Sequence, residues 1–232
     1  MSLWSRLRGS VQGALGRSAR DEPLSRVRWI DAHDNPFGVE LLDCRSFAQS
    51  MLAVSGDPRV AESYALLRAS LGEECRGQAP HNPETHDCDL RYPAATEPPE
   101  GPLFKSGDME EKWDIYHYDG NLYFARSWTG ELSYRAQVEF REDATNIVAV
   151  TAGRAPFEAD PHYPIAVVDF LIRSHVFGLA VPHPLPEPPG RDPRQLALFS
   201  FSQYGRRGWY GTFADTTGLQ PPALEDAEGP KA

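Results

Sequence analysis

Residues 112–140 carry the most regular pattern of hydrophobic and polar positions in the chain. Four segments alternate between the two kinds of residue, the last just beyond this range: 112–118, 122–128, 132–140 and 146–152. Asp119-Gly120 and Thr129-Gly130 separate the first three. Strand side chains point alternately to the two faces of a sheet, and Asp-Gly supplies the positive backbone dihedrals of a tight hairpin. The pattern therefore predicts an antiparallel meander.

The segment 132–140 predicts the clearest strand, because its alternation has no break. Its apolar residues predict one buried face and its polar residues one face in water. A helix predicted over 164–177 supplies a partner for the buried face, since its apolar residues recur at helical spacing and Gly178 can end it. We expect this helix to pack on the apolar face of the meander.

A second helix is predicted to begin at Asp57 and Pro58. Aspartate caps the first turn of a helix, and proline at the first helical position loses no hydrogen bond. We expect this helix to end at Gly72, which suits a helix terminus. Its predicted buried face consists of Val60, Tyr64, Leu67 and Leu71.

The remaining pattern predicts shorter elements and connections. Strands are expected at 27–30, 39–43, 196–201 and 208–213. Residues 73–103 are polar and rich in proline, which predicts an ordered loop. Residues 2–18 carry an apolar stripe and arginines, as a membrane-surface helix would. Because three glycines interrupt that stripe, we favour a helix that packs on its own domain or frays.

Together these elements predict a single α+β domain over residues 1–215. An antiparallel meander of about 4–6 strands packs against helices, mainly on one face. The N-terminal helical part spans 1–72, the connector 73–103, and the sheet with its helix 104–213. A two-lobed chain is the alternative, because the connector is long. Residues 216–232 have little to bury and are expected to form a disordered tail.

Composition narrows the classes of function. The chain has 232 residues, 41% of them hydrophobic, three cysteines and a formal net charge of -10 at pH 7. This charge disfavours nucleic acid as a partner, because phosphate binding requires a basic face. No apolar run has the length of a membrane span, and the N-terminus lacks a secretory signal, so we expect a cytoplasmic protein. The common nucleotide, metal and nucleophile motifs are missing, so neither a cofactor nor a catalytic residue is predicted.

The connector contains the residues with metal-binding chemistry, which are Cys75, His81, His86 and Cys88. Two thiolates and two imidazoles are good zinc ligands, and a metal would order a polar loop. However, their spacing matches no recognised finger, and ligands two residues apart fit a closed tetrahedral site poorly. We therefore favour ordinary loop residues over a zinc site. Cys44 follows an apolar strand and is expected to be a core residue instead of a nucleophile.

Arg126 and Trp128 form the first candidate binding cluster. They share a face if one strand runs through both, and arginine beside tryptophan can bind a carboxylate, a phosphate or an aromatic ring. The alternative is that Trp128 lies in the core and Arg126 pairs with Asp114 or Glu139 across the sheet.

Two further clusters lie nearer the C-terminus. One consists of Arg206, Arg207 and Trp209. It could hold a phosphate or stack on a base, or it could be a turn with solvated arginines and packed aromatics. The other consists of Arg173 and His175 at the end of the predicted helix, where they could hold a ligand. Alternatively they complement the helix dipole, with Arg173 paired to Asp169 one turn before.

Four segments also carry a resemblance to known proteins. They read KWDIY from Lys112, LYFARSWTG from Leu122, DFLIRSH from Asp169 and PHPLP from Pro182. These segments resemble a group of uncharacterised bacterial proteins without an established activity, loosely from Asp34 to Phe213. The resemblance implies a bacterial, intracellular protein and transfers no catalytic residue. It also favours one cluster made of Arg126, Trp128, Arg173 and His175.

The acidity, the aromatic residues and the lack of a catalytic signature favour a non-catalytic protein-binding module over an enzyme. The expected partner is another protein of basic character, for example a toxin neutralised by an immunity-type protein. The alternative is an enzyme or sensor for a small anionic or nucleotide-like ligand. Arg126, Arg173 and His175 would then hold the ligand, and Trp128 would stack on it. A deep pocket lined by these residues would favour the alternative.

Overall fold

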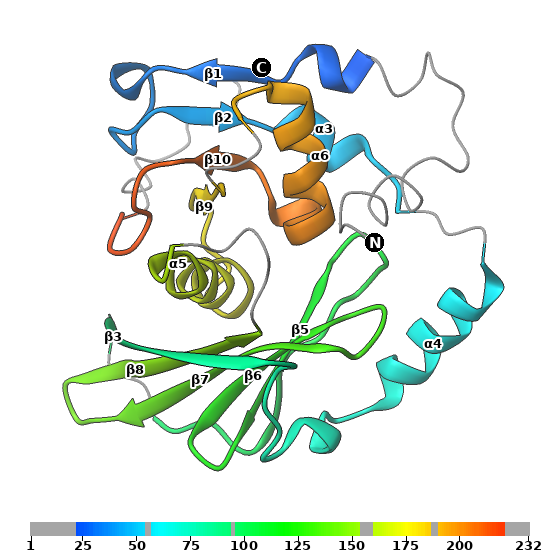
Figure 1. Ribbon diagram of the computed structural model, residues 1–232, viewed down its shortest axis with the longest axis vertical. Helices are drawn as coiled ribbons and strands as arrows, with labels where there is room; N and C mark the ends of the chain where they lie inside the picture. The colour runs from blue at the N-terminus through cyan, green and yellow to red at the C-terminus, as the bar shows by residue number, and fades with distance from the viewer. Residues whose placement is uncertain (1–21, 54–56, 94–95, 154–159, 187–189, 221–232) are drawn as a thin grey trace, which may run out of the picture.

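Two β-sheets enclose a buried helix (Figure 1). The computed structural model describes residues 22–53, 57–93, 96–153, 160–186 and 190–220. The α+β class with antiparallel strands is confirmed. None of the helices in these ranges is long and apolar enough to cross a membrane.

The larger sheet is antiparallel and contains the predicted meander. Its strand order is β3-β8-β7-β6-β5-β4. The strands are β3 Pro83–Pro93, β4 Gly101–Phe104, β5 Trp113–Tyr118, β6 Asn121–Arg126, β7 Leu132–Phe140 and β8 Ala144–Gly153. Asp119 and Gly120 have φ values of 49° and 65° between β5 and β6, as a hairpin with two left-handed residues requires.

The smaller sheet is mixed and was not predicted as a separate layer. Its order is β1-β2-β10-β9, with β1 Arg28–Ile30, β2 Leu41–Asp43, β10 Tyr210–Thr212 and β9 His183–Pro184. The helices α3 Arg45–Ser50 and α6 Pro193–Tyr204 contribute to its core. The strand predicted at 208–213 therefore exists as β10 but belongs to this second sheet. The strand predicted at 196–201 is wrong, because those residues lie in α6.

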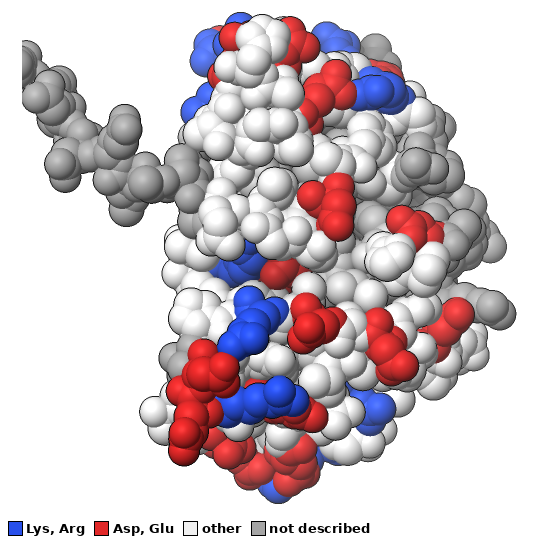
Figure 2. Space-filling view, turned by 90° about the vertical axis from the view of Figure 1, so that its left-hand side faces the viewer, with Lys and Arg blue, Asp and Glu red and all other residues white. Residues whose placement is uncertain are grey.

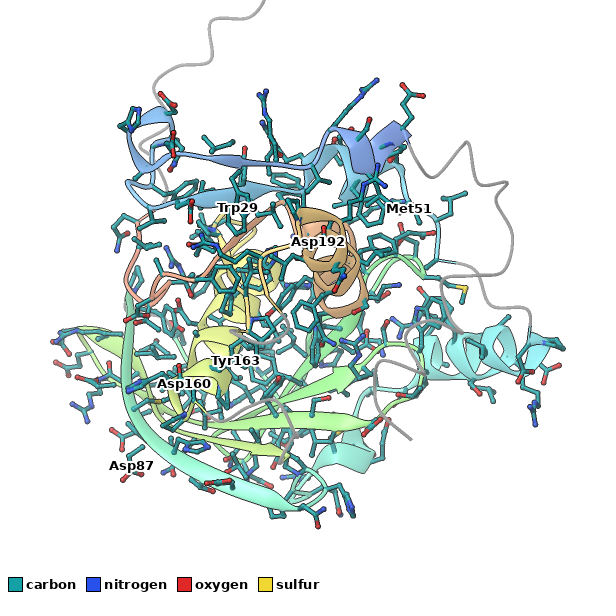
Figure 3. All side chains as sticks on the ribbon, turned by 45° about the horizontal axis from the view of Figure 1, so that its top comes forward. Trp29, Met51, Asp87, Asp160, Tyr163 and Asp192 are labelled. Carbon is teal, nitrogen blue, oxygen red and sulfur yellow. The ribbon has the colours of Figure 1, made fainter. Side chains whose placement is uncertain are left out.

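The central helix α5 spans His162–Leu171 and continues as the π-helix η3 at Ile172–Val176. It packs on the apolar face of the meander as predicted, in one core cluster with Phe124, Ala136 and Val150. It is buried on nearly all sides, because the smaller sheet lies over it (Figure 1). Side chains of the helix fill the space between the layers (Figure 3). The apolar stripe in the sequence predicts burial of one face of the helix only, which is less burial than the structure shows.

The connector predicted over 73–103 is largely a part of the sheet. It begins with the short helix η2 Glu73–Cys75 and then forms β3 and β4, the two edge strands. The prediction of a loop was wrong because Leu90 and Tyr92 face the core, while most other side chains of β3 lie in water. An edge strand with one short buried stretch has a weak alternating pattern.

The helix α4 spans Pro58–Ala69 and begins as predicted, with the Asp57 carboxylate accepting a hydrogen bond from the backbone N–H of Arg59. Val60, Tyr64 and Leu67 are partly buried and Leu71 is exposed, so the predicted face is the less exposed side of α4 but is not buried. The helix lies beside the larger sheet, away from α5 (Figure 1). It ends at Ala69, before the predicted Gly72.

Part of the predicted disordered tail makes defined contacts. Thr216 is buried, and its carbonyl oxygen accepts a hydrogen bond from Arg173. The segment 214–220 therefore packs against the end of α5, which corrects the prediction for residues 216–220. The rest of the predicted tail, 221–232, and the predicted helix at 2–18 lie outside the described residues.

Candidate functional site

Arg126 is an internal connection between the larger sheet and α6. Its guanidinium lies 4.6 Å from the ring centroid of Trp113 and donates to the carbonyl oxygens of Ser202 and Gln203 at 2.7 and 3.1 Å. Burial lowers the pKa of Arg126 to about 10. The predicted pairing with Asp114 or Glu139 was wrong, because the side chain points to the opposite face of the sheet and meets backbone carbonyls there.

Trp128 lies in the turn after β6 and is partly buried. Its indole N–H donates to the carbonyl oxygen of Met109 at 2.8 Å, and the Lys112 Nζ lies 4.5 Å from its ring. Burial lowers the pKa of Lys112 to about 7, so the neutral and charged forms of this amine coexist near neutral pH. The indole is therefore engaged by its own chain on one edge and one face.

The cluster of Arg206, Arg207 and Trp209 is likewise used within the fold. Arg206 pairs with Asp108 at 2.7 Å, and Arg207 pairs with Glu111 at 3.2 Å. Arg207 also donates to the carbonyl oxygen of Ser174 at 2.6 Å. The Trp209 carbonyl oxygen accepts from the backbone N–H of Cys44 at 2.8 Å. These residues connect the end of α6 to the loop before β5 and to η3.

His175 is buried within η3. Its Nδ1 lies 2.8 Å from the hydroxyl oxygen of Ser174, and its ring meets Phe104 edge-on at 4.9 Å between centroids. Within the described residues its Nε2 has no hydrogen-bond partner. Burial and, second, the nearby Arg207 lower the pKa of His175 to about 3. The imidazole is therefore neutral and enclosed, away from solvent.

The smaller sheet contains another enclosed polar group. His183 Nε2 lies 2.8 Å from the Ser200 hydroxyl oxygen, and both side chains are fully buried. Burial raises the pKa of the neighbouring Cys44 thiol to about 12. Cys44 is thus a core residue, as the sequence predicted, and its thiol is a poor nucleophile.

The four candidate zinc ligands do not converge. Cys75 packs on the outer face of the larger sheet, and Cys88 packs against the inner core. Among the described residues, the group of three close metal-ligand side chains is instead Asp31, His33 and Asp34, all exposed.

The predicted cluster of Arg126, Trp128, Arg173 and His175 does not form as one site either. Arg126 contacts the last turn of α6, and Trp128 contacts the loop before β5. Arg173 instead contacts the segment after β10, at Thr216. His175 lies against Phe104 of edge strand β4. Of the four, Arg173 lines a cavity.

That cavity has a volume of about 700 Å³ and lies between β3, the end of the central helix and the segment 217–220. It is lined by Asp89, Leu90, Arg91, Tyr92, Pro93, Asp169, Arg173, Phe177, Leu179, Thr217, Gly218 and Gln220. Its size is in the range of pockets that hold small molecules or several side chains of a partner. Among the candidate binding residues predicted from the sequence, only Arg173 lines this cavity.

The floor of the cavity is a buried polar triad. The Tyr92 hydroxyl donates to Asp169 Oδ1 at 2.8 Å, and Arg173 lies 3.4 Å from Asp169 Oδ2. Burial raises the pKa of Asp169 against the opposing effect of these two partners, and it raises the pKa of Tyr92 as well. Arg173 also donates to the carbonyl oxygens of Thr216 and Leu219. The predicted pair of Asp169 and Arg173 is confirmed.

Two exposed apolar side chains stand at the mouth of the cavity. Phe177 and Leu179 are 43% and 36% exposed, and both line it. Asp169, Arg173 and Phe177 follow one another at intervals of four residues, so they share one face of the helical segment. The sequence shows this spacing, but β3, the strand on the opposite side of the cavity, was not predicted from it.

The pKa of His175 predicts a pH effect on stability. Below pH about 6.5 an unfolded chain protonates this histidine, whereas the folded protein excludes the proton until pH about 3. Stability is therefore lost as the pH falls through this window. We expect His175→Asn to reduce the stability difference between pH 7 and pH 5 by about 2 kcal/mol, measured by urea unfolding.

His33→Asn is the matched control, because this side chain is 79% exposed and meets water in both states. The control is expected to retain the pH dependence of the original protein. An equal pH dependence in His175→Asn and the original protein would show that the folded state admits the proton.

Comparison of the chain with protein-family models, curated proteins and solved structures gave no match.

Proposed function

We propose that this chain is a non-catalytic protein-binding module that receives apolar side chains of a partner in the cavity beside β3. The observation that carries this proposal is the pair of exposed hydrophobic residues, Phe177 and Leu179, at the mouth of a cavity of about 700 Å³. Exposed apolar side chains that border a concave surface are typical of sites for protein partners.

The charges of the cavity favour this function over the binding of a small anion. Arg173 is paired with Asp169, and Arg91 is paired with Asp143 at 2.6 Å. Asp89 adds a further carboxylate to the lining. An anion would have to compete with Asp169 for Arg173 and would meet a second carboxylate, that of Asp89. A partner that offers apolar groups and hydrogen-bond donors fits these charges better.

The buried histidines and Cys44 support binding over catalysis, because they do not line the cavity. His175, His183 and Cys44 are buried, and a substrate in the cavity would not reach them. The cysteines are free thiols, which supports a cytoplasmic setting because such thiols persist in reducing compartments. An immunity-type role with a basic toxin as partner is part of this proposal, because the net charge of -10 would speed their encounter.

The proposal is tested by selecting peptides from a random phage-displayed library on the immobilised protein. Binding of the selected peptides is then measured by fluorescence anisotropy to the original protein and to Leu179→Asp. We expect a loss of affinity of at least about tenfold, because the aspartate replaces one of the two apolar side chains at the mouth with a charge. Leu66→Asp is the matched control, since Leu66 is 77% exposed on α4 and does not line the cavity.

Peptides that bind Leu179→Asp as tightly as the original protein would place binding elsewhere and overturn the proposal. So would a selection that enriches no peptide. Peptides that lose affinity for both variants equally would indicate a general effect of added charge, which also contradicts a site in the cavity.

A further inference from the structure

We infer that the partner enters as an extended segment that adds to the open edge of β3 as a further strand, and that this segment carries basic residues next to its apolar anchor. The inference rests on the proposed function and specifies both how the partner binds and its chemical character.

The first observation is the position of the cavity relative to β3. This strand lies at one end of the order of the larger sheet, so one of its edges has no neighbouring strand in that order. Five consecutive residues, 89–93, line the cavity. Leu90 and Tyr92 are buried on the inner face of the sheet, whereas Asp89 and Arg91 are exposed. Because residues of both faces reach the same cavity, the cavity lies along the edge of the strand.

An edge in this position offers backbone hydrogen bonds. In an antiparallel pair, successive residues direct their N–H and C=O groups alternately toward the partner strand and away from it. The register of β3 against β8 shifts between Asp87 and Leu90, so the alternation is continuous only on either side of this irregularity. Over residues 90–93 every second residue directs its backbone groups to β8, and the residues between them face the cavity side. Addition of a strand to such an edge is a common way to bind peptides, with pockets for alternate side chains.

The helical side of the cavity fits the side chains of such a strand. Residues that point to the inner face would extend past Tyr92 toward Phe177, where the cavity is apolar. Tyr92 and Phe177 already meet edge-on at 5.6 Å between ring centroids, which gives an aromatic wall. An aliphatic or aromatic anchor of the partner would contact this wall.

The charges near the edge of β3 favour basic residues beside the apolar anchor of the partner segment. Asp87 and Asp89 are exposed on β3, and Figure 3 places Asp87 at the outer margin of the molecule. Acidic side chains, with some basic ones among them, cover the lower part of the surface in Figure 2, over the larger sheet. A second copy of this chain would bring the same acidic edge against this one, with like charges in opposition. A segment with lysine or arginine meets attraction instead.

The first experiment tests the extended conformation. A peptide selected on the original protein is synthesised with one backbone nitrogen methylated at a time, and each version is measured by fluorescence anisotropy. Strand addition predicts that methylation weakens binding at least about tenfold at every second residue, because alternate amides donate to β3. A uniform tolerance, or a period of three to four residues as in a bound helix, would overturn the inference.

The second experiment tests the basic character. The same library is selected on the double variant Asp87→Lys and Asp89→Lys, and on the control Glu22→Lys, whose exposed residue lies outside the cavity lining. Peptides from the original protein and the control should be rich in lysine and arginine, whereas those from the double variant should be rich in aspartate and glutamate. Equal compositions would refute the charge selection.

These outcomes separate the two proposals. Peptides that depend on Leu179 but show neither the period of two nor the charge preference would leave the protein-binding function intact and reject this inference. A selection that enriches no peptide, or peptides insensitive to Leu179→Asp, would reject both.

Discussion

Replacing Gly205 with alanine is expected to destabilise the protein by more than about 3 kcal/mol. Gly205 follows the last residue of α6 with φ 60° and ψ -136°, a conformation that residues with a side chain rarely adopt. A Cβ atom at this position would lie 1.7 Å from the carbonyl oxygen of Glu110. Because that oxygen belongs to the backbone, no rotation of a side chain can relieve the overlap.

The contact between Gly205 and Glu110 also holds two layers together. The Glu110 carbonyl oxygen accepts a hydrogen bond from the backbone N–H of Arg206 at 3.2 Å. The same loop carries Asp108, which pairs with Arg206. Alanine would therefore separate the end of α6 from the loop before β5. The midpoint of urea unfolding should fall accordingly.

Gly38→Ala separates the two causes of this loss. Gly38 also has a positive φ, 69°, but a Cβ there would meet nothing within 4 Å. Its replacement is expected to cost only about 1 kcal/mol, the price of the left-handed conformation alone. Equal losses in the two variants would show that the loop at Glu110 moves aside without cost and that the close approach is unimportant.

The meander was predictable from the sequence because its information is local. Each strand of 112–140 alternates with a period of two, and Asp119-Gly120 can adopt the backbone of a tight hairpin. Antiparallel neighbours joined by short turns need no contact between distant parts of the chain. The helix after it was equally clear, because Gly178 and a strong apolar spacing define it.

The helix α6 was mistaken for a strand because it is buried on more than one side. Residues 196–201 read LALFSF, and such a short apolar run has no period that separates a strand from a buried helix. The residues that indicate a helix come just before this apolar run. Asp192 accepts a hydrogen bond from the backbone N–H of Arg194, and Pro193 occupies the first turn, the same start that correctly identified α4.

The cavity could not be located from the sequence because it joins three distant segments. Asp169, Arg173 and Phe177 are spaced for one face of a helix, but the helix alone does not show what lies opposite. The opposite wall is β3, hidden in a polar segment with prolines at both ends. The third wall is 217–220, where the composition predicts little to bury. Arginines in the meander were better candidates by residue type, yet the fold uses them for internal contacts.

Replacing Asp114 with asparagine is expected to destabilise the protein by about 3–5 kcal/mol. Asp114 is buried on β5 and accepts hydrogen bonds from Arg68 at 2.9 and 2.5 Å and from Lys105 at 3.1 Å. The backbone N–H of Ser106 donates to it at 2.8 Å. Asparagine has nearly the same shape but removes the negative charge, so two partly buried cations lose their common partner.

The exposed pair of Arg76 and Asp119 provides the control. Its distance of 2.6 Å is as short, but the Asp119 side chain is 55% exposed. Asp119→Asn should therefore lower the midpoint of urea unfolding much less than Asp114→Asn, because water screens the pair. Both variants are compared by urea unfolding at neutral pH. A loss for Asp114→Asn no greater than that for Asp119→Asn would show that the two cations find water without moving.

The position of α4 makes the result of Asp114→Asn visible locally as well. Arg68 is the residue of α4 that reaches the sheet through this carboxylate, and Lys105 donates to the carbonyl oxygen of Leu67 at 2.8 Å. Because α4 contributes no buried residue, these polar contacts hold it more than apolar packing does. Hydrogen exchange of the α4 amides should therefore accelerate more than that of β6 and β7.

Adding Arg68→Met to Asp114→Asn should restore part of the lost stability, because it removes one of the two unpaired charges. A double variant less stable than Asp114→Asn alone would mean that Arg68 stabilises α4 chiefly through its contact with the Tyr64 ring, 4.5 Å away.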